Sequence, residues 1–301
     1  MPSELHTYQY FGLGLHSEMP FPELEQEDVP RDVLLRLGSV ESPKPSEVTL
    51  PGWYRFDEDR IEHGWDEVGR FLVQGSDEFV VDLEPGVDLP FVRSMMIGQF
   101  AALLFARRGY LPLHASSVLV NDRVFALTAE SGTGKSTAAL GLVARGAELF
   151  SDDLLPVDFS HGGAQVFPGT TILKLSPQSR ARVPFELEEL PMAYAREEKI
   201  AYRAPSVRDR GARELAGLMF LENGPEFGFE VLRGPAALFN LQGAVHRRDL
   251  LPQTVGTRAW IERTALGLSR FPVARLTWVR DLNRIDEMAE RTLEALATWS
   301  A

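Results

Sequence analysis

Over the first 90 residues of this chain, short apolar or alternating runs are separated by Gly, Pro and acidic clusters. Runs of this length, divided in this way, are typical of strands joined in a meander. The runs that predict strands are residues 33–37, 53–56, 70–73 and 79–83. Residues 41–51 favour a loop. We therefore expect a β-rich N-terminal module over residues 1–90.

Beyond residue 90, helical and strand-like patterns alternate. Helices are expected at residues 90–108, 136–145, 235–247, 257–268 and 285–299. Strands are expected at residues 111–120, 123–128, 148–150, 166–175, 215–222, 229–232 and 273–279. The first two strands favour a hairpin, and residues 215–222 and 229–232 favour a second strand pair. Over residues 91–301 the pattern predicts an α/β fold, with a central sheet flanked by helices.

A glycine-rich segment joins the strand at 123–128 to the helix at 136–145. Residues 129–136 read A-E-S-G-T-G-K-S, one residue short of the Walker A, or P-loop, pattern G-x-x-x-x-G-K-[ST]. Gly132 and Gly134 can adopt backbone angles that turn successive N–H groups inward, toward an anion. Ala129 replaces the first glycine of the pattern, and its methyl group is tolerable only if its φ is negative.

This segment predicts a site for ATP and Mg²⁺. The start of the helix adds a positive dipole end to the anion site. Lys135 supplies a cation for the β- and γ-phosphates, and the Ser136 hydroxyl suits magnesium. The residues expected to bind the nucleotide are Ser131, Gly132, Thr133, Gly134, Lys135, Ser136 and Thr137.

Composition narrows the possible partners. With 301 residues, 44% hydrophobic and 25% charged, the chain is typical of a globular protein of one or two domains. Its net charge of −12 disfavours nucleic acid and anionic membranes as partners. The absence of cysteine excludes disulfides, cysteine-ligated metals and thiol nucleophiles. No signal peptide or membrane-length apolar run is evident, so a cytoplasmic location is expected.

Two further features flank the glycine segment. Asp152 and Asp153 directly follow the strand predicted at 148–150, where carboxylates can hold magnesium or take a proton from an attacking hydroxyl. A solvated acidic turn is the alternative, but beside a phosphate site we favour a functional role. His114 lies upstream of the hairpin, and a lone histidine is more often structural than catalytic.

The whole stretch from His114 to Asp153 resembles the catalytic domain of the HPr kinase/phosphorylase family. It reads H-A-S-S-V-L-V-N-D-R-V-F-A-L-T-A-E-S-G-T-G-K-S-T-A-A-L-G-L-V-A-R-G-A-E-L-F-S-D-D. In that family a histidine precedes the loop, and an aspartate pair follows it, at the same separations as here. The resemblance implies an HPr-kinase-like domain that transfers the γ-phosphoryl of ATP to a serine hydroxyl of a protein or peptide. It implies that Asp152 is the base, Asp153 a magnesium-linked carboxylate, and His114 a polar or acidic partner beside catalytic Lys135.

Other parts of the chain modify this expectation. Residues 166–177, V-F-P-G-T-T-I-L-K-L-S-P, look like a segment of shorter relatives of HPr kinase, some of which act in peptide-modifying pathways. The family's L-E-I-R-G segment and N-terminal domain are absent, which disfavours HPr as the acceptor and phosphorylase activity. The family resemblance suggests a homo-oligomer. A nucleotide-binding regulatory protein and a small-molecule kinase remain alternatives.

The remaining charged candidates carry weaker signals. Lys174 can serve as a cation near the phosphates or as an ordinary surface lysine. Residues 196–213 can form either a mobile loop that closes over ATP or a solvated loop. The arginines of this segment with a possible role in transfer are Arg203, Arg208, Arg210 and Arg213. The histidines without a metal-ligand partner at a suggestive spacing are His63, His161 and His246.

Overall fold

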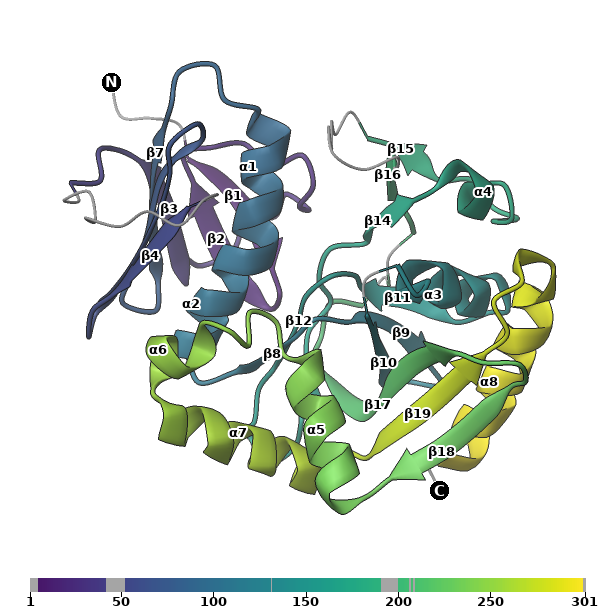
Figure 1. Cartoon of the computed structure of the whole chain (residues 1–301). Coiled ribbons are helices and arrows are strands. Elements are labelled where there is room, and N and C mark those ends of the chain that lie inside the picture. Colours follow the sequence, from purple (N-terminus) through teal and green to yellow (C-terminus); the bar gives the residue numbers. More distant parts are fainter. Residues whose placement is uncertain are drawn as a thin grey trace.

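The computed structural model describes residues 5–41, 52–130, 132–190, 200–205, 207 and 209–299. It is a mixed α/β structure built around two large sheets, one N-terminal and one central (Figure 1). Nearly all of the loop predicted at 41–51 lies outside the described residues. Ser131, Arg208 and residues 196–199 also lie outside them.

The N-terminal sheet has the strand order β1-β2-β3-β7-β6-β5-β4. Its strands are β1 (His6–Tyr10), β2 (Leu13–Ser17), β3 (Val33–Leu37), β4 (Trp53–Phe56), β5 (Arg60–Trp65), β6 (Gly69–Gln74) and β7 (Glu78–Leu83). The four predicted strands are confirmed, whereas β1, β2 and β5 were missed. In β5 the polar residues Glu62 and His63 are buried beside apolar Ile61, so the strand shows no polar–apolar alternation.

A long helix covers this sheet (Figure 1). It comprises α1 (Leu89–Met95), the π-helical turn η1 (Met96–Phe100) and α2 (Ala101–Arg107). Phe100 stacks on Phe71 at 4.8 Å, and Phe105 on Tyr10 at 5.9 Å. This helix is long and apolar enough to cross a membrane, with a mean hydropathy of 1.5, whereas the sequence analysis expects no such segment. Within the protein, however, 72% of its most apolar stretch is buried. It is therefore a core helix, and the domain boundary near residue 90 stays a prediction.

The central sheet has the order β11-β9-β10-β17-β19-β18. Its strands are β9 (Ser116–Val120), β10 (Arg123–Ala129), β11 (Glu148–Ser151), β17 (Arg213–Asn223), β18 (Gly228–Leu232) and β19 (Val273–Trp278), with β13 (Gln165–Val166) paired to β17. Strands β10, β17 and β19 run parallel, while β9 and β18 run antiparallel to their neighbours. The hairpin of β9 and β10 is confirmed.

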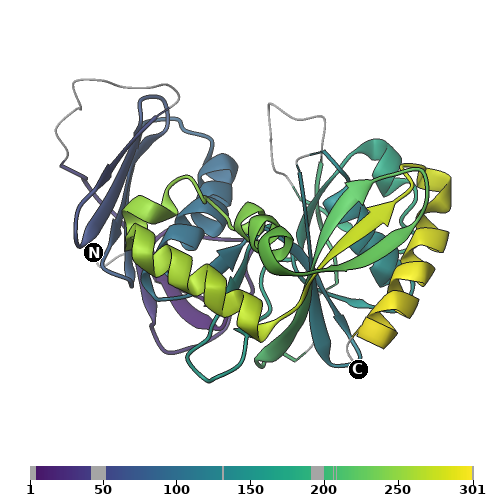
Figure 2. The ribbon, with the colours of Figure 1, turned by 60° about the horizontal axis from the view of Figure 1, so that its bottom comes forward.

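Helices cover both faces of the central sheet (Figure 2). On one face lie α3 (Lys135–Ala144) and α8 (Ile285–Trp299), and on the other α5 (Gly234–Ala244), with α6 (Leu251–Val255) and α7 (Thr257–Arg270) beyond it. Along β10, Phe125 and Leu127 join the core under α3 and α8, whereas Val124 and Ala126 join the core under α5. Burial on both faces explains the uninterrupted apolar run of β10.

The strand pair predicted from residues 215–222 and 229–232 is wrong, because β19 lies between β17 and β18. Strand β17 is buried on both faces and pairs in parallel with β10 and β19, which leaves β18 with exposed Glu230 and Val231 at the edge. The predicted strand 111–120 is also divided. Its first part, β8 (Leu111–Leu113), pairs with β12 (Leu155–Val157) outside the central sheet.

A small sheet lies beside the central one. It consists of β14 (Ile172–Leu175), β16 (Ile200–Arg203) and β15 (Glu188–Glu189). The short elements α4 (Pro177–Arg180) and the 3₁₀ turn η2 (Leu282–Arg284) follow β14 and β19 respectively. These pieces complete one end of the central sheet, where the candidate site lies.

Candidate functional site

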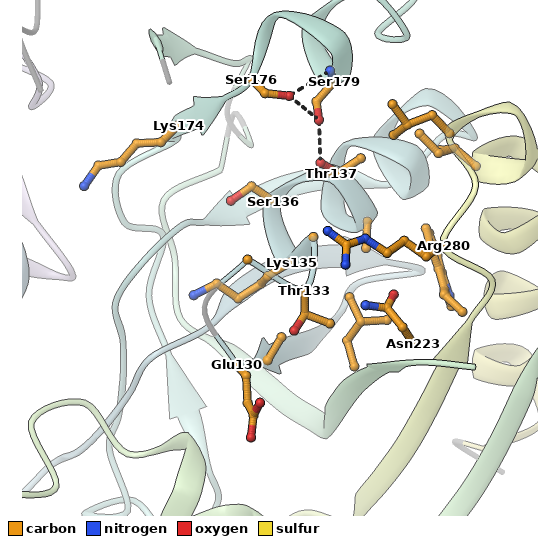
Figure 3. A pocket seen from close by; sticks show the side chains of 18 of the residues that line it. Glu130, Thr133, Lys135, Ser136, Thr137, Lys174, Ser176, Ser179, Asn223 and Arg280 are labelled. Atoms are coloured by element: carbon orange, nitrogen blue, oxygen red, sulfur yellow. Dashed lines mark hydrogen bonds between the residues drawn. The ribbon is translucent and has the colours of Figure 1, made fainter. Parts of the chain in front are cut away.

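The carboxyl ends of four strands meet at one edge of the central sheet. Strands β10, β17 and β19 are parallel, and β11 shares their direction because both β10 and β11 run antiparallel to β9. In open α/β sheets, ligands bind in the crevice outside the carboxyl ends of the strands. A cleft of about 670 Å³ opens here, lined by residues at or just beyond the ends of all four strands. Figure 3 labels Glu130, Asn223 and Arg280, which lie at the ends of β10, β17 and β19.

The glycine segment forms one wall of this cleft. It leads from β10 to α3, and both Gly132 (φ +83°) and Gly134 (φ +107°) adopt the left-handed conformation that favours glycine. Ala129 belongs to β10 and has a negative φ, as predicted. Helix α3 begins at Lys135 with no side-chain cap on its first N–H groups. Those donors and the helix dipole therefore make this wall suitable for an anion.

The Lys135 ammonium and His114 lie together in the cleft. Lys135 Nζ is 3.0 Å from His114 Nε2, and His114 Nδ1 is 2.9 Å from the backbone oxygen of Asp153. Because lysine donates and a carbonyl accepts, the ring is the neutral tautomer with its proton on Nδ1. Burial, and then the charge of Lys135, lower the pKa of His114 and keep it neutral.

The adjacent carboxyls Asp152 and Asp153 have opposite pKa shifts. Burial raises the pKa of Asp152, whose residue is only 5% exposed, although Lys135 and Ser116 oppose the shift. Burial also acts to raise the pKa of Asp153, but His114, His246 and Lys135 outweigh it and lower the value to about 2. Asp153 is therefore ionised at neutral pH, whereas Asp152 holds a proton more readily. Such a divergence separates a proton acceptor from a permanent anion.

Neighbouring segments fix the position of Asp152. The Ser116 hydroxyl at the start of β9 donates a short hydrogen bond to Asp152 Oδ1. The Asp152 N–H donates to the carbonyl of Thr170 at 2.7 Å. Gly169, the neighbour of Thr170, packs closely against Ser151: a Cβ at Gly169 would come within 2.2 Å of Ser151 Oγ. The side chain is consequently held by close packing and hydrogen bonds.

The long N-terminal helix also reaches this site. Gly98 lies in the π-helical turn, and a Cβ there would come within 3.2 Å of Asp153 Oδ2. Gln99 in the same turn accepts a hydrogen bond from Arg247, whose guanidinium also lies over the ring of Tyr54. π-Helical turns are frequent at functional sites. The helix thus links the N-terminal sheet to the acidic pair.

The two hydroxyls at the start of α3 differ in their surroundings. Thr137 Oγ1 donates to Ser179 Oγ on α4 at 3.1 Å, and Ser176 also bonds to Ser179 (Figure 3). Ser136 lines the cleft, and its hydroxyl lies on the same side of the loop as the Lys135 ammonium (Figure 3). Ser136 is therefore the better placed of the two to meet a bound ion.

The predicted site residues that the structure describes all line this cleft: His114, Gly132, Thr133, Gly134, Lys135, Ser136, Thr137, Asp152 and Asp153. Lys174 also lines it and helps to lower the pKa of Asp153. The arginines at 203, 210 and 213 do not: they contact Glu188, Glu25 and Asp209 outside the cleft. Arg203 and Arg210 form ion pairs with glutamates from other segments of the chain.

Three cleft or near-cleft residues were missed. Asn223 ends β17 and Arg280 follows β19, so the carboxyl ends of the predicted strands could have indicated both. In Figure 3 the Arg280 guanidinium reaches into the cleft on the side of the glycine segment. His246 stacks edge-on against His114 at 5.2 Å, and burial lowers its pKa to about 4. No local spacing signals that contact.

Comparisons with known proteins add little. No protein-family model matches the chain, and a search of curated proteins finds no match. Among solved structures, the HPr(Ser) kinase/phosphatase from Coxiella burnetii is similar, with 11% sequence identity and a TM-score of 0.30, over 62% of this chain and 98% of that one. That likeness is too weak to carry an argument. The geometry of the cleft therefore carries the functional inference.

Proposed function

We propose that this protein is an ATP- and magnesium-dependent kinase that transfers the γ-phosphoryl to a serine hydroxyl of a small protein or peptide. The observation that carries the proposal is the acidic pair in the cleft of the glycine segment. One carboxyl has a raised pKa and the other a strongly lowered one. Phosphoryl transfer to a hydroxyl needs a proton acceptor and an anion for the metal side by side.

The wall formed by the glycine segment binds the polyphosphate. The N–H groups of residues 132–137 and the start of α3 face the phosphates, and Lys135 leaves His114 Nε2 to meet the β- and γ-oxygens. The Ser136 hydroxyl and the ionised Asp153 are oxygen donors, the kind that magnesium prefers, so these residues fit that ion. When bound, magnesium neutralises charge on the phosphates.

Asp152 acts on the acceptor. Its carboxylate orients the serine hydroxyl and takes its proton as the oxygen bonds to the γ-phosphorus, while the bond to the bridging oxygen of ADP breaks. The Ser116 hydrogen bond leaves the second carboxylate oxygen available for this contact. The raised pKa makes Asp152 a stronger base than an exposed aspartate.

Arg280 supplies a cation that the sequence analysis did not assign. Its guanidinium reaches into the cleft beside the glycine segment (Figure 3). An arginine placed there stabilises negative charge on the transferring group. We assign this role to Arg280 rather than to the arginines at 203, 210 and 213, which have carboxylate partners elsewhere.

The proposed partners follow from the same expectations as before. The proposed acceptor is a serine of a protein or peptide, and neither nucleic acid nor a membrane is a proposed partner. We further propose that the protein is a homo-oligomer and that it is located in the cytoplasm. A non-catalytic nucleotide-binding regulator would need the glycine segment but no base at Asp152. The Asp152 carboxyl therefore distinguishes the two functions.

A transfer assay tests the proposal. Radiolabelled ATP is supplied with a library of serine-containing peptides and with the same library carrying alanine in place of serine. We expect only the serine library to be labelled. In Asp152→Asn the rate of labelling should fall on the order of 10²–10⁴-fold. Asp122→Asn, which changes an aspartate with an 81% exposed side chain, serves as the control. Nucleotide binding without any transfer would favour the regulator, and full transfer by Asp152→Asn would remove the assigned base.

A further inference from the structure

Three potential metal ligands converge beside the cleft. His114, Asp153 and His246 each offer one ligand atom, and these atoms all lie within 4.8 Å of one another. They come from three distant parts of the chain: the break between β8 and β9, the end of β11, and the segment after α5. Two imidazoles and one carboxylate form a donor set that suits zinc-like ions.

Backbone hydrogen bonds hold the two histidines together. The His114 N–H donates to the carbonyl of Ala244 at 2.7 Å, and the His246 N–H donates to the carbonyl of Pro112 at 2.8 Å. An isolated bridge between Leu113 and Val245 lies between these bonds. Main-chain pairing thus fixes the backbones of the two histidines relative to each other, which places their rings on neighbouring positions.

The His246 ring has an unexplained nitrogen. Among the described residues, its Nδ1 is buried and has no hydrogen-bond partner. Buried polar atoms are nearly always satisfied, so an orphan calls for a ligand or another cause. A metal ion would satisfy an imidazole nitrogen of this residue, and the neighbouring Asp153 carboxylate would balance the charge.

His114 has a lone pair directed at a cation. Its Nδ1 lies 2.9 Å from the backbone oxygen and 3.3 Å from Oδ1 of Asp153, so in this tautomer the nitrogen with a lone pair for a metal ion is Nε2. The Lys135 ammonium lies 3.0 Å from this atom. A metal ion at Nε2 and the lysine therefore compete for one lone pair.

We infer that His114, Asp153 and His246 form a binding site for a divalent transition-metal ion of the zinc class, in competition with Lys135. The site shares Asp153 with the proposed magnesium position but differs from it because its other two donors are nitrogens, whereas magnesium prefers oxygen ligands. The three protein ligands leave a fourth tetrahedral position open. The site does not require the proposed kinase activity.

Cobalt(II) titration of the nucleotide-free protein tests this inference. Co²⁺ replaces Zn²⁺ in such sites and reports its coordination by visible absorption. We expect one Co²⁺ per chain, displaced by Zn²⁺ but not by excess Mg²⁺. His246→Gln should weaken binding on the order of 10- to 100-fold. The exposed His161 provides a matched control, and His161→Gln should leave binding unchanged.

A second variant separates ligation from general damage to the fold. Lys135→Met removes the competing ammonium and should strengthen Co²⁺ binding, a gain that misfolding cannot produce. The inference is overturned if the wild type gives no tetrahedral Co²⁺ spectrum, if His246→Gln binds like the wild type, or if Lys135→Met binds no more tightly. Since no nucleotide is used, the outcome is independent of the transfer assay.

Discussion

The two large sheets of this protein both bury charged groups, but they do so differently. In the N-terminal sheet the Glu62 side chain is 1% exposed and is paired with Arg55 and Arg60. Between β2 and β3, the Glu23 side chain is 2% exposed, and both of its carboxylate oxygens accept from the Nε–H of Arg93 on α1. Each of these carboxylates has its partner in the N-terminal sheet or in the helix that covers it. At the edge of the central sheet, Asp152, Asp153, His114 and Lys135 instead face a common cleft.

This difference separates charges that pair within the fold from charges that face an open cleft. A buried ion pair satisfies its own members, and removing one partner leaves the other unpaired in the interior. The central cluster combines groups of different kinds with strongly perturbed pKa values beside an open cavity, which is typical of functional sites. Substitutions in the first region should therefore change stability, and those in the second should change activity.

The largest expected effect is on stability, from Arg93→Met. This change leaves the Glu23 carboxylate buried without its Arg93 partner and should lower the free energy of unfolding by about 3–5 kcal/mol. Denaturant unfolding measures it, and Arg258→Met, at a 92% exposed side chain, is the control. Mg·ADP affinity of the folded fraction should not change. A variant as stable as the wild type would contradict the structural role.

Lys135→Met should have the opposite profile. Loss of the ammonium removes a charge aimed at the phosphates, and phosphoryl transfer should fall on the order of 10²–10³-fold. The free energy of unfolding should change little, because the lysine does not belong to a hydrophobic core cluster. Transfer assays and denaturant unfolding on the same preparation give both values. If Lys135→Met unfolded at a much lower denaturant concentration but transferred phosphate at the wild-type rate, Lys135 would have a structural role and not a catalytic one.

A buried histidine gives the N-terminal sheet a pH-dependent stability. Burial lowers the pKa of His63 to about 4, and its Nδ1–H donates to the carbonyl of Trp53. Since the unfolded chain binds this proton near pH 6.5, stability is full above that pH and falls as pH drops toward 4. Between pH 7 and 5 the loss from this group should be about 2 kcal/mol.

Denaturant unfolding at both pH values, in the wild type and in His63→Phe, isolates this contribution. The phenyl ring can stack as the imidazole does on Tyr54, at 4.2 Å. Between pH 7 and 5 the free energy of unfolding should fall by about 2 kcal/mol less in His63→Phe than in the wild type. An identical pH dependence in both proteins would show that His63 does not titrate between these states.

The smallest effect should come from Arg280→Gln. Glutamine keeps much of the length and polarity of the side chain but removes its charge, so transfer should fall on the order of tenfold, less than for Lys135→Met. Arg270→Gln changes an exposed arginine outside the cleft and is the matched control. Equal rates in the two variants would remove Arg280 from the site.

The sequence predicted the parts of the fold that depend on local pattern. The β10–glycine segment–α3 unit is local, and Asp152 follows a strand that comes directly after it, so both could be placed from spacing alone. Strand β5 was missed because buried Glu62 resembles a surface residue until Arg55 is known to neutralise it. The pairing of β17 was wrong because β19 inserts from far along the chain.

The candidate site shows the same division. The predicted site residues near the glycine segment that the structure describes lie in the cleft, including His114 and Asp153. His246 arrives through main-chain pairing across more than 100 residues, which no local pattern encodes. Arg280 follows a predicted strand, but its place beside the glycine segment depends on the order of the strands in the sheet. Several arginines lie close together in the sequence near residue 210. Those that the structure describes form ion pairs outside the cleft.

Hydrogen–deuterium exchange with and without Mg·ADP tests most directly whether the carboxyl edge of the central sheet binds the nucleotide. Bound phosphates should slow exchange of the amides in residues 132–137, because these N–H groups would become hydrogen-bonded donors. Strands β3 to β7 of the N-terminal sheet should exchange unchanged. Unaltered exchange at residues 132–137 with saturating Mg·ADP, or protection confined to the N-terminal sheet, would contradict the proposed site.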